Sequence, residues 1–136
     1  MKIEEFQKLK DLAESELKIT EDNVMDKSIQ LSNLYSRFLN IYIKELRILK
    51  EISVDKDKIY GELYDKYKFH FDYQLDGKSE IDTYVRKDDK FYQIALTYSQ
   101  QEVQVQFLEQ TLNHINNLGF RIKNFVDLKK IKMGLL

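Results

Sequence analysis

The 136-residue sequence has no cysteine, no proline and no tryptophan, and it has only four glycines. Without cysteine the chain forms neither a disulfide nor a thiolate site, which agrees with a reducing compartment. Scarce helix breakers, together with a charged fraction of 33%, are typical of long exposed helices with few turns. We therefore expect an all-α fold in a single domain, residues 1–136.

The sequence also lacks long apolar runs and recognisable catalytic constellations. The sequence contains no run of eighteen consecutive apolar residues, which is about the length needed to span a membrane. The first residues, MKIEEFQKLK, do not resemble a signal peptide. The two histidines, His70 and His114, have no carboxylate or second histidine at metal-ligand spacing, so both are expected to be structural or exposed. Phosphate-cradling glycine loops and nucleophile elbows are missing. These features predict a cytoplasmic, non-enzymatic protein without metal or cofactor.

Apolar residues at alternating spacings of three and four dominate the last third of the chain. This seam period is typical of helices packed against other helices, and it predicts a helix or helices over 89–133, capped by Asp88 or Asp89. Gly119 either ends this helix through a left-handed cap or lies inside a continuous one. The apolar face is wide enough for a multi-chain assembly, so we interpret the segment as the oligomerisation element. Its central residues are Val105, Leu108, Leu112, Ile115, Gly119, Ile122 and Val126.

Two further helices are expected before this segment, a short amphipathic one over 1–18 and a central one over 32–68. Glu45 and Lys56 interrupt the apolar seam of the central helix, which predicts that its middle is less buried. Gly61 costs about 1 kcal/mol relative to alanine inside a helix, so the helix is expected to end or bend there.

The segment 69–88 breaks the helical pattern. Phe69, Phe71, Tyr73 and Leu75 alternate with polar residues, as in a strand, and Asp76-Gly77 is a turn signal. The segment is therefore interpreted as a connector or as a short β-hairpin that pairs with the stretch 81–85.

Lysines and tyrosines are interleaved at the end of the central helix. Single strands of nucleic acid are held without sequence preference by cations at the phosphates and aromatic rings at the bases. Acidic residues offset most of this charge, so two interpretations stay open: a weak single-strand-binding site or an ordinary solvated helix face. The candidate DNA-binding residues are Lys56, Lys58, Lys66, Lys68, Tyr64 and Tyr67.

Several stretches resemble the UvsY recombination mediators of T-even-type bacteriophages. They are NLYSRFLNIY at 33–42, the basic, tyrosine-rich 56–67, RKDDK at 86–90 and, above all, LEQTLNHINNLGFRIKNFVDLKKIKMG at 108–134. The resemblance covers most of the chain in order.

This resemblance implies a homo-oligomer, a heptamer in the best-known member, that binds single-stranded DNA in the host cytoplasm. Its partners would be a phage RecA-like recombinase, which it helps to load, and the phage single-strand-binding protein that covers the strand. The family's DNA-binding Lys-x-Arg pair would fall on Lys56 and Lys58, where lysine replaces arginine and removes the bidentate fork to phosphate.

Two functions from different classes follow. The first is a recombination mediator that acts in DNA recombination, repair and replication. In this interpretation several weak sites on one oligomer act together on a single strand. The alternative is a helical oligomeric adapter or structural protein that binds only other proteins. Binding of single-stranded DNA at low salt separates the two.

Overall fold

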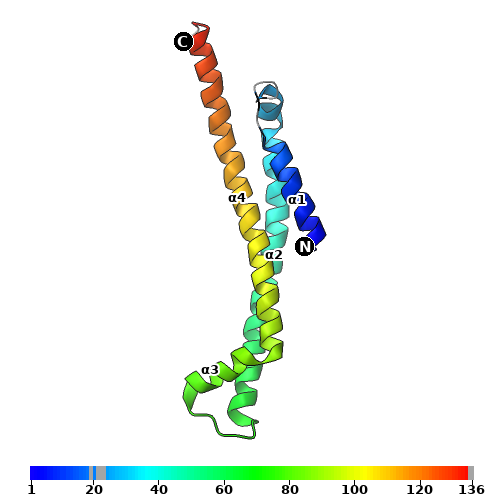
Figure 1. Cartoon of the computed structure of the whole chain (residues 1–136), viewed down its shortest axis with the longest axis vertical. Coiled ribbons are helices and arrows are strands. Elements are labelled where there is room, and N and C mark those ends of the chain that lie inside the picture. The colour runs from blue at the N-terminus through cyan, green and yellow to red at the C-terminus, as the bar shows by residue number, and fades with distance from the viewer. Residues whose placement is uncertain (19, 21–23, 135–136) are drawn as a thin grey trace. The chain divides into compact units, whose positions relative to one another are not determined.

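The computed structural model describes residues 1–18, 20 and 24–134, and these residues form four helices and no strand. In chain order they are α1 (Ile3–Glu16), α2 (Val24–Phe69), α3 (Gly77–Lys87) and α4 (Asp89–Lys132) (Figure 1). The all-α fold predicted from the scarcity of breakers is confirmed. Helix α2 begins before residue 32 and passes through Gly61 without ending, and α4 passes through Gly119 as one continuous helix.

The chain divides into two compact units. Unit 1 contains residues 1–44 and 104–136, and unit 2 contains residues 45–103. Helices α2 and α4 each contribute one part to unit 1 and the other to unit 2, whereas α1 belongs to unit 1 and α3 to unit 2.

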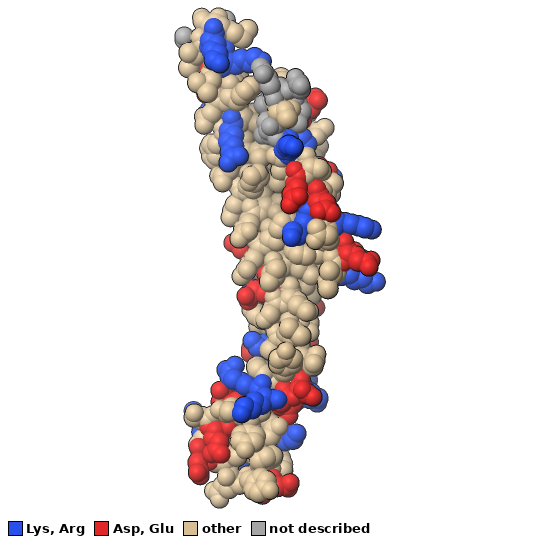
Figure 2. All heavy atoms as spheres, in the orientation of Figure 1, with Lys and Arg blue, Asp and Glu red and all other residues tan. Residues whose placement is uncertain are grey.

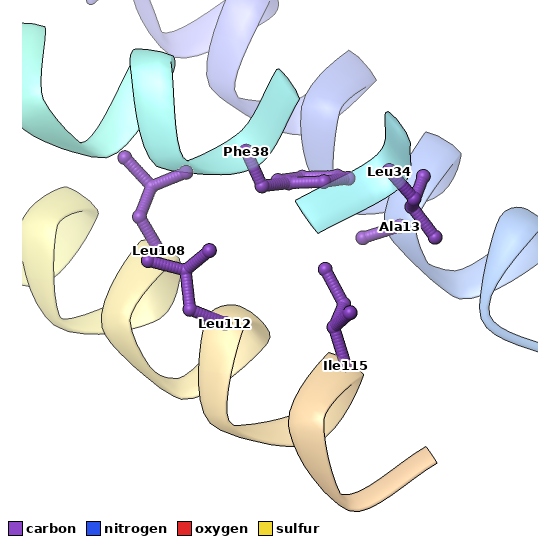
Figure 3. Close-up of a cluster of buried hydrophobic side chains, with 6 residues drawn as sticks. All are labelled: Ala13, Leu34, Phe38, Leu108, Leu112 and Ile115. Atoms are coloured by element: carbon purple, nitrogen blue, oxygen red, sulfur yellow. The ribbon is translucent and has the colours of Figure 1, made fainter. Parts of the chain in front are cut away.

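Unit 1 is a packing of α1 against parts of α2 and α4. Its core consists of Ala13 from α1, Leu34 and Phe38 from α2, and Leu108, Leu112 and Ile115 from α4 (Figure 3). Leu118 and Ile122 extend this apolar contact along α4 towards Leu17 and Leu31. The three-four spacing of these residues places them on one side of each helix, which is why the helices associate along that side.

The core of unit 2 lies around α3. Ile81 and Val85, one helical turn apart, are buried against Leu63 of α2 and Phe91 of α4. The short β-hairpin considered for 69–85 is therefore wrong, because residues 77–87 are helical. A helix buries Ile81 and Val85 together, whereas an isolated hairpin would have needed further packing to be stable. Of the alternating residues before it, Phe71 and Leu75 are half-buried and Tyr73 is exposed.

The middle of the central helix differs from expectation. Glu45 is buried rather than loosely packed, with only 4% of its surface exposed. The Gln101 side-chain amide donates to the Glu45 carboxylate at 2.7 Å and to its backbone carbonyl at 2.9 Å. Because a buried polar group is tolerated only when it is hydrogen-bonded, the pair explains how both residues interrupt an apolar seam.

Candidate nucleic-acid interface

All six candidate DNA-binding residues lie on the last turns of α2, in unit 2. Lys58, Lys66 and Lys68 are exposed, whereas Lys56, Tyr64 and Tyr67 are half-buried. Residues two apart on a helix are separated by about 200° around its axis, so Lys56 and Lys58 point to different sides. The structure does not bring this pair together.

Lys56 reaches across to α4. Its ammonium lies 4.7 Å from the ring centroid of Tyr98 and 5.9 Å from that of Phe91. A cation this close to a ring face is attracted by the ring's quadrupole, which holds the flexible lysine in one place. The Lys56 side chain is therefore positioned over an aromatic surface of unit 2.

Arg86 is a functional candidate that the sequence reasoning missed. Its guanidinium carbon lies 5.8 Å from the centroid of the same Phe91 ring, so α2 and α3 each place a cation on one aromatic residue of α4. The Arg86 Nε donates to Asp82 at 2.9 Å, and the Tyr60 hydroxyl donates to the other Asp82 oxygen at 2.5 Å. These two hydrogen bonds, that from Tyr60 first, lower the pKa of the Asp82 carboxyl. The one available sequence signal was the RKDDK stretch.

A second carboxylate organises the junction between α3 and α4. The Tyr67 hydroxyl donates to Asp88 at 2.8 Å, and the Lys66 ammonium lies 3.7 Å from the same carboxylate oxygen. The other Asp88 oxygen accepts the backbone N–H of Lys90 at 2.9 Å, so Asp88 caps α4, as predicted. The Tyr67 hydrogen bond is the main reason why the pKa of Asp88 is lowered.

The two candidate tyrosines are consequently engaged within unit 2. The Tyr67 hydroxyl is bound to Asp88, and the same hydrogen bond raises the pKa of Tyr67. The Tyr64 ring lies 6.1 Å from that of Tyr60, at the edge of the unit 2 core. Both tyrosines therefore contribute mainly to the packing of the helices within unit 2.

The outcome is a convergence of cations near the α3–α4 junction. Lys56 and Arg86 both lie beside the Phe91 ring. Lys66 lies beside Asp88, which precedes Phe91 by three residues in the sequence. Figure 2 shows blue side chains gathered over this part of unit 2, with acidic side chains beside them. Such a mixed surface can contact phosphates, but the neighbouring carboxylates keep each contact weak.

The seven candidate oligomerisation residues lie on the inner side of α4, and all seven belong to unit 1. Val105, Leu108, Leu112, Ile115 and Ile122 are buried, and Gly119 and Val126 are half-buried. Their unit 1 partners are α1 and α2 of the same chain, including Leu31, whose Cδ2 lies 3.4 Å from where a Gly119 Cβ would stand. The seam that was expected to meet other copies is thus packed within one chain.

A different side of α4 remains apolar and open. Phe120, Leu128 and Ile131 are 69%, 60% and 57% exposed. Their spacing places them on one side of the helix, away from the buried Leu118 and Ile122.

The remaining candidates from the sequence are the two histidines. His70 and His114 are both exposed, as expected. Within residues 1–18, 20 and 24–134 no three histidine or acidic side chains gather as metal ligands. None of the helices in the same residues is long and apolar enough to cross a membrane.

Comparisons with known proteins agree on one family. The family model described as "Recombination, repair and ssDNA binding protein UvsY" matches residues 12–135. Crystal structures of the bacteriophage T4 recombination mediator protein UvsY have the same fold. In one lattice the TM-score is 0.83 at 20% identity, with 98% of each chain covered. In another it is 0.80 at 17% identity, with 93% of this chain and 98% of that chain covered. No curated protein sequence matched.

Proposed function

Because this chain belongs to the UvsY family of recombination, repair and single-stranded-DNA-binding proteins, we propose that it holds the strand at the α3–α4 junction of unit 2. The family consists of non-enzymatic mediators, so the physical task is to bind and present DNA. Lys56, Arg86 and Lys66 contact phosphates of one strand, and Lys68, at the end of α2, extends the contact.

The observation that carries this proposal is the meeting of Lys56 and Arg86 on Phe91. Both cations are held in place by the ring, at 5.9 and 5.8 Å from its centroid. Preorganised cations lose less side-chain entropy when a phosphate arrives than freely moving ones do. Arginine adds the planar fork that suits phosphate, and the Lys-x-Arg position at Lys58 lacks it.

Weak contacts of this kind suit a mediator. A protein that binds the strand without reading bases can bend or extend it, loosen the grip of the single-strand-binding protein and present the strand to a RecA-like recombinase. Too tight a grip would compete with the recombinase for the same phosphates. We propose that Asp82 and Asp88 keep the affinity per subunit low for this reason.

Fluorescence anisotropy of a labelled oligothymidylate at several salt concentrations tests the site. We expect Lys56→Gln and Arg86→Gln each to weaken binding and to reduce the slope of log affinity against log salt by about 0.7, the value for one phosphate contact on a single strand. Lys50→Gln, an exposed lysine of α2 away from the junction, is the matched control.

Three outcomes would change this assignment. A Lys58→Gln effect as large as that of Lys56→Gln would favour the pair implied by the family resemblance. Unchanged binding in both the Lys56 and Arg86 variants, with unchanged thermal unfolding, would place the site elsewhere. No binding of the wild-type chain at low salt would favour the protein-binding adapter.

We also propose that the chain works as a homo-oligomer. The inner seam of α4 is occupied within one chain, so self-association would use the open apolar side that carries Phe120, Leu128 and Ile131. Exposed apolar residues grouped on one side of a helix are typical of interaction surfaces. Several subunits would then bring several weak DNA sites to one strand.

A further inference from the structure

Four aromatic rings form a contiguous cluster where α2 ends and α3 begins. Phe71 lies at its centre, with ring centroids 5.1 Å from Tyr67, 5.4 Å from Tyr84 and 5.9 Å from Tyr73. Tyr67 and Tyr84 also contact each other, at 5.7 Å. These distances lie in the range of favourable aromatic pairs, so the rings support one another.

Exposure divides the cluster into a base and an open side. Tyr67 and Phe71 are half-buried, whereas Tyr84 is 39% exposed and Tyr73 is 74% exposed. Aromatic side chains stabilise a fold mainly through the surface that they bury. Tyr73 and Tyr84 contact neighbouring rings but stay partly uncovered, so they contribute less stability by burial than fully covered rings would. An arrangement that fixes rings and leaves them open is suited to a flat ligand.

We propose that Tyr73 and Tyr84 form a stacking platform for bases of the single strand. The inference rests on the proposed DNA binding and extends it from phosphate contacts to base contacts. Every base has an aromatic face, so stacking strengthens binding without sequence readout. The phosphate-contacting Arg86 follows Tyr84 by two residues on α3 and points to a different side of the helix, so a strand that contacts both residues has to pass around this short helix.

Cations lie beside the aromatic cluster, where they can meet the phosphates of a strand whose bases stack on the platform. The Lys68 ammonium lies 5.1 Å from the centroid of the exposed Phe69 ring, and the exposed Lys66 lies 5.1 Å from that of Tyr67. The carboxylates of Asp82 and Asp88 are occupied by Tyr60 and Arg86, and by Tyr67 and Lys66. Lys68 therefore lies at the rim beside an exposed ring, whereas Lys66 and Arg86 share their charge with Asp88 and Asp82.

The test compares an oligothymidylate with an abasic oligonucleotide of the same length, which keeps the phosphates and lacks the bases. We expect the Tyr73→Ala/Tyr84→Ala protein to lose on the order of tenfold in affinity for oligothymidylate, because each stacked base contributes substantially. Affinity for the abasic strand should change by less than about twofold. Tyr73→Phe/Tyr84→Phe, which keeps both rings, should restore base-dependent binding. Tyr92→Ala on α4, an exposed tyrosine outside the cluster, is the control and should behave as the wild type.

A second measurement avoids any effect of truncation on folding. The chain has no tryptophan, so Tyr73→Trp introduces a single reporter at an exposed position. Its fluorescence should be quenched by oligothymidylate and much less by the abasic strand.

The outcomes separate this inference from the proposed function. Equal losses of affinity for the two oligonucleotides, no loss in the alanine variant, or equal quenching by both would overturn the platform while leaving DNA binding intact. Failure of the wild-type protein to bind either oligonucleotide would refute the proposed function and the platform with it.

Discussion

Asp88, the residue that follows α3, links α2 to α4 through its side chain. It accepts the Tyr67 hydroxyl from α2, lies beside Lys66 and caps the first turn of α4. Asp88→Ala removes the cap and leaves the half-buried Tyr67 hydroxyl without its acceptor. Loss of an N-cap alone costs about 1–2 kcal/mol. We expect thermal or urea unfolding at pH 7 to show a loss of at least this order, and Asp89→Ala, the exposed neighbour, to show a smaller one.

The pH dependence of that difference follows from the lowered pKa of Asp88 in the folded chain. A carboxyl whose pKa is lower in the folded than in the unfolded state stabilises the fold above its unfolded pKa, about 3.9. The stabilisation decreases as the pH falls below that value and is lost once the pH passes the folded pKa. Urea unfolding of wild type and Asp88→Ala should therefore converge in part below pH 4. A difference that stayed constant from pH 7 to pH 3 would show that the charge of Asp88 contributes nothing.

At the scale of the helices, alanine substitutions at two glycines should change the free energy of unfolding in opposite directions. A Cβ added at Gly61 would meet nothing within 4 Å, and α2 continues through this position. Gly61→Ala should raise the free energy of unfolding by about 1 kcal/mol, the difference in helix propensity. Gly77 has a φ of +79° at the start of α3, a left-handed conformation that alanine adopts only with strain, so Gly77→Ala should lower it by a similar amount. Denaturant titration of the two variants checks both signs.

The helices were largely predictable from the sequence because their apolar period is local. The spacing of Leu108, Leu112 and Ile115 is enough to define the apolar side of α4, whatever that side packs against. The identity of that partner was not predictable, since a seam that packs on α1 and α2 and a seam that packs on another copy have the same period. Helix α3 was missed because its two buried residues, Ile81 and Val85, are too few to establish a period against the alternation before them.

The residues of the candidate DNA-binding site also fall into those that the sequence predicted and those that depend on the packing of the helices. Lys56 and Lys66 were in the predicted set because cations and tyrosines alternate along one segment. Arg86 was not, because its place beside the Phe91 ring depends on how α3 and α4 pack in unit 2. Lys58 was included because the Lys-x-Arg pair of the resembled family falls on Lys56 and Lys58, although the helix turns these two side chains apart.

For the molecule as a whole, the two sides of α4 should have separable roles. Leu112→Ala empties part of the unit 1 core and should cost about 2–5 kcal/mol of stability. Leu128→Ser/Ile131→Ser changes exposed positions, so it should leave the unfolding of the chain nearly unchanged. If the open side mediates assembly, light scattering coupled to size exclusion should show a smaller mass for the serine variant than for the wild type. Equal masses would exclude this surface as the subunit contact.

Assembly in turn should determine how tightly a long strand is held. Linked weak sites act at a high effective concentration, so affinity grows with the number of sites that one strand reaches. The Leu128→Ser/Ile131→Ser protein should bind a short oligonucleotide that spans one site as the wild type does, and should lose one to two orders of magnitude on a long strand. Anisotropy with oligothymidylates of increasing length measures both. Equal losses at every length would mean that the substitutions damage the individual site, and no loss at any length would mean that each chain binds DNA independently.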